Sequence, residues 1–192
     1  MSVPDCQALI DAYFAKYPRV GDFLKDCQAR SQPPHQWLVT CFGRRRRFIR
    51  SKDKKVVGEQ QRQAQNFPIQ GTVADAVNRA LDNLTLYRLE HTELLYRILL
   101  QIHDALLFEV PIPELKVFTT DETDAQGAIV RPSVLRECMC DRVPVWPRRL
   151  DNTPMGVQTA YHFGIDTEVA INWGEAVTEE QCREFGIDPS LV

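Results

Sequence analysis

The sequence lacks the features of a membrane or exported protein. Its apolar runs are all too short to cross a bilayer, and Asp5 and Asp11 stand where an export signal needs a basic start and an apolar block. Six cysteines are scattered, and the close pair Cys138 and Cys140 has neither zinc-knuckle nor CxxC spacing. These absences exclude a disulfide-rich scaffold, and they predict a protein of the reducing cytoplasm with no membrane partner.

Acidic charge is scarce in the first third of the chain, although the net charge is only −3. Residues 1–62 hold 13 Lys and Arg against 6 Asp and Glu, a net of +7, and residues 63–192 hold 10 against 20, a net of −10. Eight of the twelve residues 44–55 (RRRRFIRSKDKK) are basic. This asymmetry predicts a polyanion partner for one face. The basic run itself is either a solvated loop or a segment that contacts phosphates.

Apolar spacing of three and four residues predicts two helical regions. The first covers residues 4–30 and is broken near Pro18, which cannot continue a helix. The second covers residues 72–90, with Thr72 as the first residue of a capping box. Residues 62–71 (RQAQNFPIQG) then stand before this helix as a loop that is unusually rich in amides.

Runs of β-branched and aromatic residues predict strands at residues 37–43 and 168–173, with a short acidic helix from Thr178. The run at 99–111 (LLQIHDALLFEVP) consists of two apolar halves around His103 and Asp104. Either this pair is the tip of a hairpin or it places a charge inside the fold. The mixture of separate helices and hairpins predicts an α+β protein.

The segments GRRRRF, RQAQNFPIQGTVADAVNRAL and LLQIHDALLFEVP occur in an order and spacing that resembles the C-terminal part of family A DNA polymerases, the DNA polymerase I type. YFAKYP (13–18) and INWGEA (171–176) resemble the family's flanks. The most specific signal is NFPIQGT followed some thirty residues later by HD in a hydrophobic strand. The resemblance runs from about residue 5 to 111 and lapses over much of 112–165.

The resemblance implies a partial polymerase palm, in which an antiparallel hairpin called motif C is packed by helices. Residues 1–62 would form a helical fingers-side segment with the basic loop. Residues 63–192 would form the palm portion with the motif C hairpin and a C-terminal segment. The implied activity is that of a DNA-directed DNA polymerase, a nucleotidyltransferase of DNA replication, acting on primer–template DNA.

The resemblance also implies the metal-binding residue. Asp104 would be a catalytic residue that ligates Mg²⁺, a hard ion that takes carboxylate and phosphate oxygens. Two such ions lower the pKa of the primer 3′-hydroxyl and stabilise charge on the leaving pyrophosphate. His103 would lie beside the primer terminus and hydrogen-bond to backbone oxygen, without acting as a general base.

The implied DNA contacts come from amide and guanidinium side chains. Every base pair offers acceptors at its minor-groove edge, so donors aimed there test base-pair geometry without reading sequence. Basic side chains on phosphates add affinity that depends on salt. The minor-groove set is Arg62, Asn66 and Gln70, and the phosphate set is Arg44, Arg45, Arg46 and Arg47.

Two departures from the family pattern limit this reading. Ala105 stands where the family usually has a glutamate after His-Asp, and Glu109 lies about 13 Å further on at ~3.3 Å per residue. The upstream motifs A and B, which supply another carboxylate and the triphosphate-binding helix, are absent from the 192 residues. The resemblance therefore predicts the small subunit of a split polymerase, as in phages, that is inactive without a larger polypeptide bearing both motifs. A fragment of a longer polymerase is the other origin.

Two other functions remain open. The chain could be a non-catalytic remnant that binds duplex DNA, with Ala105 as a mark of lost catalysis. It could also be a phosphohydrolase that uses His-Asp as a metal pair, but that function needs further ligands, and His35, His91 and His162 show no supporting spacing.

Overall fold

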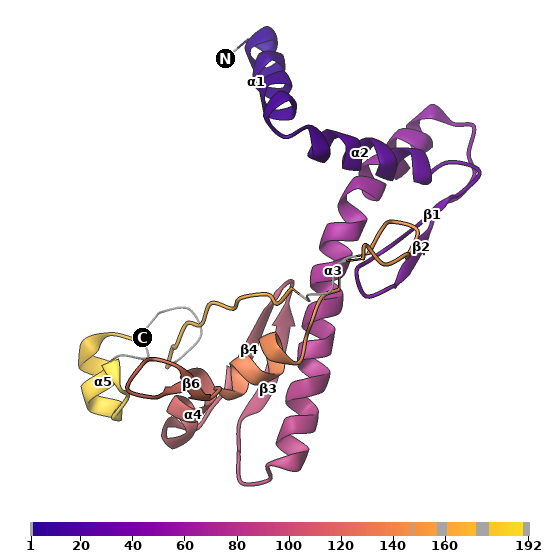
Figure 1. The fold of residues 1–192 in the computed structure, drawn as a ribbon. Coiled ribbons are helices and arrows are strands. Elements are labelled where there is room, and N and C mark those ends of the chain that lie inside the picture. The colour runs from indigo at the N-terminus through magenta and orange to yellow at the C-terminus, as the bar shows by residue number, and fades with distance from the viewer. Residues whose placement is uncertain (1, 147, 157–160, 172–176, 190–192) are drawn as a thin grey trace. The chain divides into compact units, whose positions relative to one another are not determined.

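The computed structural model describes residues 2–146, 148–156, 161–171 and 177–189 (Figure 1). Helices and small antiparallel hairpins make up the chain, so the predicted α+β class is confirmed. The elements in chain order are α1 (Val3–Lys16), α2 (Pro18–Arg30), β1 (Trp37–Val39), β2 (Arg45–Arg47), α3 (Lys54–Glu90), β3 (Arg97–Ile102), β4 (Ala105–Glu109), η1 (Ile112–Glu114), α4 (Leu115–Thr119), β5 (Glu122–Thr123), β6 (Ile129–Arg131), η2 (Arg136–Asp141) and α5 (Glu179–Phe185). None of the helices in the described ranges is long and apolar enough to cross a membrane.

The chain forms two compact units. Unit 1 consists of Met1–Thr72 with Trp146–Val157, and unit 2 of Val73–Val145 with Gln158–Val192. Helix α3 therefore contributes its first half to unit 1 and its second half to unit 2. The division into a fingers-side segment and a palm portion after residue 62 concerns function and stays a prediction.

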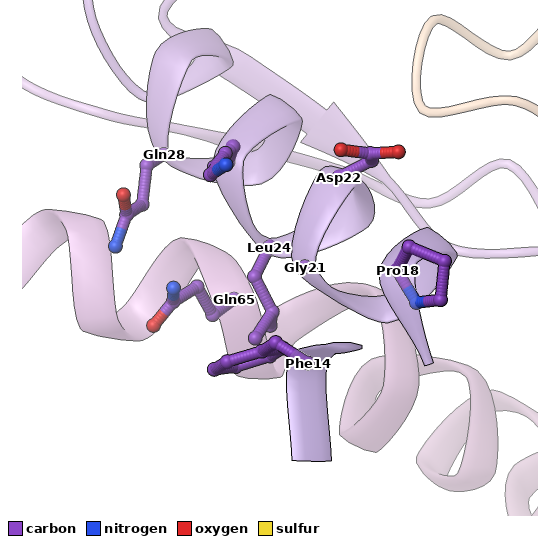
Figure 2. Close-up of a pocket in the computed structure, with 8 residues that line it drawn as sticks. Phe14, Pro18, Gly21, Asp22, Leu24, Gln28 and Gln65 are labelled. Atoms are coloured by element: carbon purple, nitrogen blue, oxygen red, sulfur yellow. The ribbon is translucent and has the colours of Figure 1, made fainter. Parts of the chain in front are cut away.

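Unit 1 begins with the two helices that the sequence predicts. The break falls at Tyr17, and Pro18 opens α2, where its missing N–H costs no helical hydrogen bond. Helix α1 buries none of its residues, and Phe14 lies with Leu24 of α2 at a hollow of about 360 Å³ that Gln65 of α3 also lines (Figure 2). The first helix is therefore only loosely packed within its own unit.

Residues 62–71 are helical and lie inside α3, so their prediction as a loop is wrong. A buried stripe at Gln60, Ala64, Phe67 and Gly71 continues through them at three-and-four spacing. Ala64 and Phe67 pack in a cluster with the buried Leu38 of β1. Burial of this stripe outweighs the cost of Pro68 in the helix interior.

The predicted capping box at Thr72 is also wrong, because Thr72 lies in the helix interior. Its buried hydroxyl donates to the carbonyl of Pro68 (2.5 Å) and accepts from the backbone N–H of Cys41 (3.0 Å). Pro68 has no N–H and so removes one hydrogen bond from α3. The threonine hydroxyl thus ties the turn after the proline to the chain beside β1.

The basic run is not a loop throughout. Arg45–Arg47 form β2, which pairs antiparallel with β1 and sets Leu38 opposite Arg46. Lys54 and Lys55 begin α3. The solvated-loop interpretation is therefore wrong for the three strand arginines, and the predicted strand at 37–43 is confirmed for its first half.

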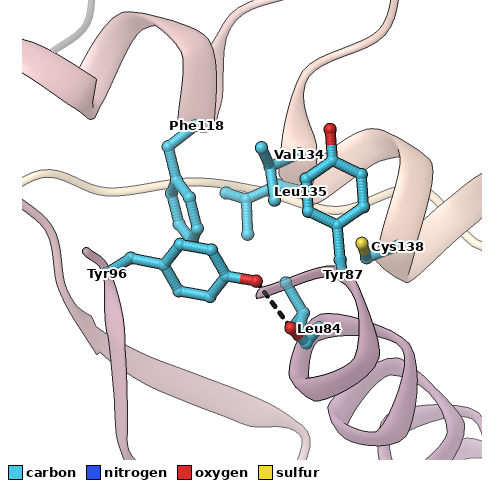
Figure 3. Packing of buried hydrophobic residues seen from close by; sticks show 7 residues of the cluster. All are labelled: Leu84, Tyr87, Tyr96, Phe118, Val134, Leu135 and Cys138. Carbon is cyan, nitrogen blue, oxygen red and sulfur yellow. Dashed lines mark hydrogen bonds between the residues drawn. The ribbon is translucent and has the colours of Figure 1, made fainter. Parts of the chain in front are cut away.

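Unit 2 is built around the second half of α3 and the predicted hairpin, which is confirmed as β3 and β4. Tyr96, which is fully buried just before β3, packs at 4.8 Å from Phe118 and donates its hydroxyl to the carbonyl of Leu84 in α3 (2.6 Å; Figure 3). Burial raises the pKa of the Cys138 thiol in this cluster to about 12, which keeps it a neutral core group. These contacts pack the base of the hairpin against the second half of α3.

The end of the chain agrees with its prediction in part. Thr178 caps α5 through a capping box with Gln181. The strand predicted over 168–173 is absent from residues 168–171, where Val169 instead packs into a small cluster around Cys182. Residues 172–176, with most of INWGEA, lie outside the described residues.

Candidate functional site

His103 and Asp104 form the two-residue turn of the β3–β4 hairpin. Ile102 and Ala105 are the last paired residues, and His103 adopts a positive φ of 55°, as tight hairpin turns require. Both side chains are exposed. Within the described part of the chain, neither makes a side-chain hydrogen bond or ion pair, so the carboxylate of Asp104 is available to a ligand.

The hairpin is apolar on both faces, but only one is covered. Ile98, Leu106 and Phe108 pack against the unit 2 core. Leu100 and Ile102 alternate with these along the strands and stay 47% and 41% exposed. A bulge at Leu99 shifts the register between Ile98 and Leu100. The hairpin is thus anchored by one face and presents a second apolar face to solvent.

Asp104 suits Mg²⁺ in chemistry but supplies a single carboxylate. Among the described residues, no three His, Cys, Asp or Glu side chains gather into a group that could hold a metal ion. Ala105 pairs with Ile102 at the turn, while Glu109 lies at the other end of β4 and forms an ion pair with Arg97 (3.5 Å). A complete Mg²⁺ site at this turn therefore needs oxygen ligands from another source.

The three residues predicted to contact the minor groove lie on one face of α3. Arg62, Asn66 and Gln70 follow one another at four-residue spacing, and all are exposed. The stripe extends about 12 Å along the helix, which corresponds to three or four base-pair steps of about 3.4 Å each. All three side chains lie off the buried stripe of α3.

The four arginines of the basic run have different surroundings. Arg46 donates to the side-chain oxygen of Gln63 (2.7 Å), and Arg44 donates to the carbonyl of Gly71 (3.1 Å). Arg45 and Arg47 point to the other face of β2, because side chains alternate along a strand. Arg45 stacks on the ring of Trp37 at 4.4 Å. Two arginines therefore hold the hairpin to α3, and two face away from it.

Three residues of this region were missed from the sequence. The ring of Trp37 stacks with Arg45. Gln63 accepts a hydrogen bond from Arg46, and Gly71 accepts one from Arg44. The sequence predicts the run as either a solvated loop or a phosphate-contacting segment. As a strand, the alternation of Arg45, Arg46 and Arg47 separates the inner from the outer arginines. The predicted site residues fall into two groups, with His103 and Asp104 in unit 2 and the others in unit 1.

Two of the remaining histidines, His91 and His162, offer no support for a phosphohydrolase site. His91 stacks on Tyr87 at 4.2 Å and lies 3.2 Å from Glu93 through its Nδ1. His162 places its Nδ1 2.9 Å from the carbonyl of Cys140. Both rings thus have local partners in unit 2.

The sequence matches known proteins over most of its length. The family model for DNA polymerase family A matches residues 1–137, which is further than residue 111, where the resemblance was expected to lapse. The chain is 31% identical to DNA polymerase I of Geobacillus stearothermophilus over 158 residues, which are 81% of this chain and 15% of that protein. It is 39% identical to DNA polymerase I of Pseudomonas aeruginosa over 109 residues, 55% of this chain and 12% of that protein.

The fold also matches a solved structure. The POL domain of Pol1 from M. smegmatis, in complex with DNA primer–template and dNTP, superposes with a TM-score of 0.60 and 29% identity. The match covers 81% of this chain and 24% of that one. The chain therefore spans about a quarter of the matched structure and 12–15% of the length of these two relatives.

Proposed function

Because the chain belongs to DNA polymerase family A, we propose that it is the C-terminal subunit of a split, phage-type DNA-directed DNA polymerase. A larger second polypeptide that bears motifs A and B would complete it, in the cytoplasm. The observation that carries the proposal is the exposed turn that presents Asp104 from a hairpin anchored on one face. The proposal assigns this hairpin to motif C.

Asp104 would hold Mg²⁺ together with ligands from the larger polypeptide and the triphosphate. When bound, Mg²⁺ supplies charge stabilisation at the reacting oxygens. The residues of this chain position the reactants. His103 would hydrogen-bond to backbone oxygen at the primer terminus, and the apolar strands on either side hold the turn rigid. Arg62, Asn66 and Gln70 would donate to minor-groove acceptors of the new duplex.

Two features of the hairpin support a partner polypeptide. Its outer face, with Leu100 and Ile102, is apolar and exposed. The sheet has only two strands, so each strand keeps an edge without a partner among the described residues. Open apolar edges of this kind are normally paired or covered. A strand and an apolar surface of the larger polypeptide would cover both.

We expect the isolated, monodisperse chain to show no primer extension with Mg²⁺ and all four dNTPs, because Asp104 supplies one carboxylate and two-metal chemistry needs more. Extension should appear when the larger polypeptide is added. The assay is single-turnover extension of a labelled primer, with the larger polypeptide alone as the control. Extension by the isolated chain at the rate of the mixture would refute the requirement for a partner.

Arg45 provides a test of the phosphate contacts. We expect Arg45→Ala to weaken binding of duplex DNA and to reduce the slope of log K against log [salt] by about 0.9, the value for one lost phosphate contact. Fluorescence anisotropy over a salt series measures both. Arg19→Ala, an exposed arginine on α2, is the matched control and should leave the slope unchanged. An unaltered slope for Arg45→Ala would remove this assignment.

The alternative proposal is a non-catalytic remnant that binds duplex DNA. It is favoured by Ala105, which places a methyl group beside the turn where the family usually has a second acid. Both proposals predict DNA binding through the arginines. The first proposal requires Asp104 for nucleotide incorporation, and the second does not. Substitution of Asp104 therefore distinguishes them.

A further inference from the structure

The inner arginines bind α3 at two points on either side of Asn66 and Gln70. Arg46 reaches Gln63, and Arg44 reaches the carbonyl of Gly71. These contacts are eight residues apart, about 12 Å along the helix. Asn66 and Gln70 lie between them. The β1–β2 hairpin thus spans the segment of α3 that carries the exposed amides.

The contact at Gly71 leaves no room for a side chain. A Cβ on Gly71 would lie 2.8 Å from Cγ2 of Thr40, 3.2 Å from the ring of Phe67 and 3.3 Å from Nη2 of Arg44. Thr40 is itself buried, and its hydroxyl accepts from the backbone N–H of Arg44 (3.1 Å). Thr40 and Arg44 therefore pack directly against the backbone of α3 at Gly71.

This contact falls where α3 is intrinsically weak. Pro68 cannot donate a helical hydrogen bond and disturbs the turn before it. The next residues are held from outside the helix, with Cys41 donating to Thr72 and Arg44 donating to Gly71. Gln70 lies within this externally held turn. Its direction therefore depends on the β1–β2 hairpin as well as on the helix.

We propose that Arg44 is a positioning residue, which holds the Pro68–Thr72 turn so that Gln70 and Asn66 meet the minor-groove edge of the duplex. Arg44 would act through these amides and not through a phosphate. The inference rests on the proposed duplex contacts. It divides the basic run into inner arginines that orient α3 and outer arginines that contact phosphates.

The test removes the acceptor atom from the DNA. In 3-deazaguanine the purine N3, a minor-groove acceptor, is replaced by C–H. The full chain should bind a natural primer–template duplex about tenfold more tightly than one with 3-deazaguanine near the primer terminus, which is the loss of about one hydrogen bond. Gln70→Ala should reduce this ratio to about one. Fluorescence anisotropy gives each affinity.

Arg44→Lys is the diagnostic variant, because it keeps the charge and loses the planar fork that reaches Gly71. We expect it to reduce the ratio of natural to 3-deazaguanine affinity to about one while the salt slope stays unchanged. Arg19→Lys, at an exposed arginine of α2 outside the basic run, is the matched control and should keep the tenfold ratio. Gly71→Ala displaces the same turn without altering charge, and it should also reduce the ratio to about one. It serves as the test if Arg44→Lys folds poorly. Thermal unfolding confirms that each variant is folded.

The outcomes separate the two proposals. If the unaltered chain binds both duplexes equally, the proposed minor-groove contacts fail. If the unaltered chain discriminates but Arg44→Lys and Gly71→Ala both keep the tenfold ratio, the positioning role of Arg44 is wrong. A reduced salt slope for Arg44→Ala with the ratio preserved would instead make Arg44 a phosphate contact. If Arg44→Lys and Gln70→Ala reduced the ratio of natural to 3-deazaguanine affinity independently, so that their effects added in the double variant, the proposal would also be contradicted. Residues that act through one another have non-additive effects.

Discussion

Asp104→Asn should lower nucleotide incorporation by about 10³-fold in the complex with the larger polypeptide, while primer–template binding stays nearly intact. The amide keeps the shape of the side chain but loses the negative charge that Mg²⁺ requires of its oxygen ligands. Loss of about 4 kcal/mol of charge stabilisation at the reacting oxygens corresponds to about 10³-fold in rate. Single-turnover incorporation and DNA binding by anisotropy measure the two quantities separately.

Glu109→Gln is the matched control for this substitution, because it removes a carboxylate from the same hairpin. Glu109 is exposed and pairs with Arg97 at the base of the hairpin, away from the turn. It should leave incorporation within about twofold, since exposed ion pairs contribute only about 0–1 kcal/mol. If Asp104→Asn also left incorporation unchanged, the chain would be a DNA-binding remnant and the assignment of motif C would fail.

Tyr96→Ala should destabilise unit 2 by about 3–5 kcal/mol, the usual cost of deleting a buried aromatic side chain. Tyr96 is fully buried, contacts Phe118 and donates a hydrogen bond to Leu84. It directly precedes β3, so its loss frees the base of the hairpin that carries Asp104. Hydrogen–deuterium exchange over residues 84–118 reports this loss for unit 2 without a contribution from unit 1.

Two further variants separate the contribution of the buried ring of Tyr96 from that of its hydroxyl group and from that of an exposed side chain of the same hairpin. Tyr96→Phe keeps the ring and should cost only about 1 kcal/mol, the net contribution of one hydrogen bond. Leu99→Ala truncates a side chain that is 54% exposed and should change stability by less than about 0.5 kcal/mol in the isolated chain. If Tyr96→Ala lowered the free energy of unfolding of unit 2 by less than about 1 kcal/mol, Tyr96 would not be the residue that anchors the hairpin.

The hairpin could be predicted because its signals are local. Two apolar runs flank His103 and Asp104, and antiparallel strands joined by two residues need no information from distant parts of the chain. The break between α1 and α2 was predictable for the same reason, because Pro18 acts on its own backbone. The partial exposure of the hairpin was not predictable, since it depends on which face meets the unit 2 core.

Residues 62–71 show where local signals mislead. Pro68 disfavours a helix, and together with the dense polar side chains it suggested a loop. The segment is helical because Ala64 and Phe67 are buried against β1 and because distant groups bond to Gly71 and Thr72. These contacts join residues about thirty positions apart, which no pattern within the segment records.

The sequence by itself determined the α+β class, the two apolar half-strands on either side of His103 and Asp104, and the excess of positive charge before residue 63. These depend on residue type and short-range spacing. Only the tertiary structure decided that Arg62, Asn66 and Gln70 share one helical face and that Arg44 and Arg46 differ in orientation from Arg45 and Arg47. The physical reason is that helix continuity through Pro68 and the direction of each arginine are set by burial and by hydrogen bonds between segments far apart in the chain.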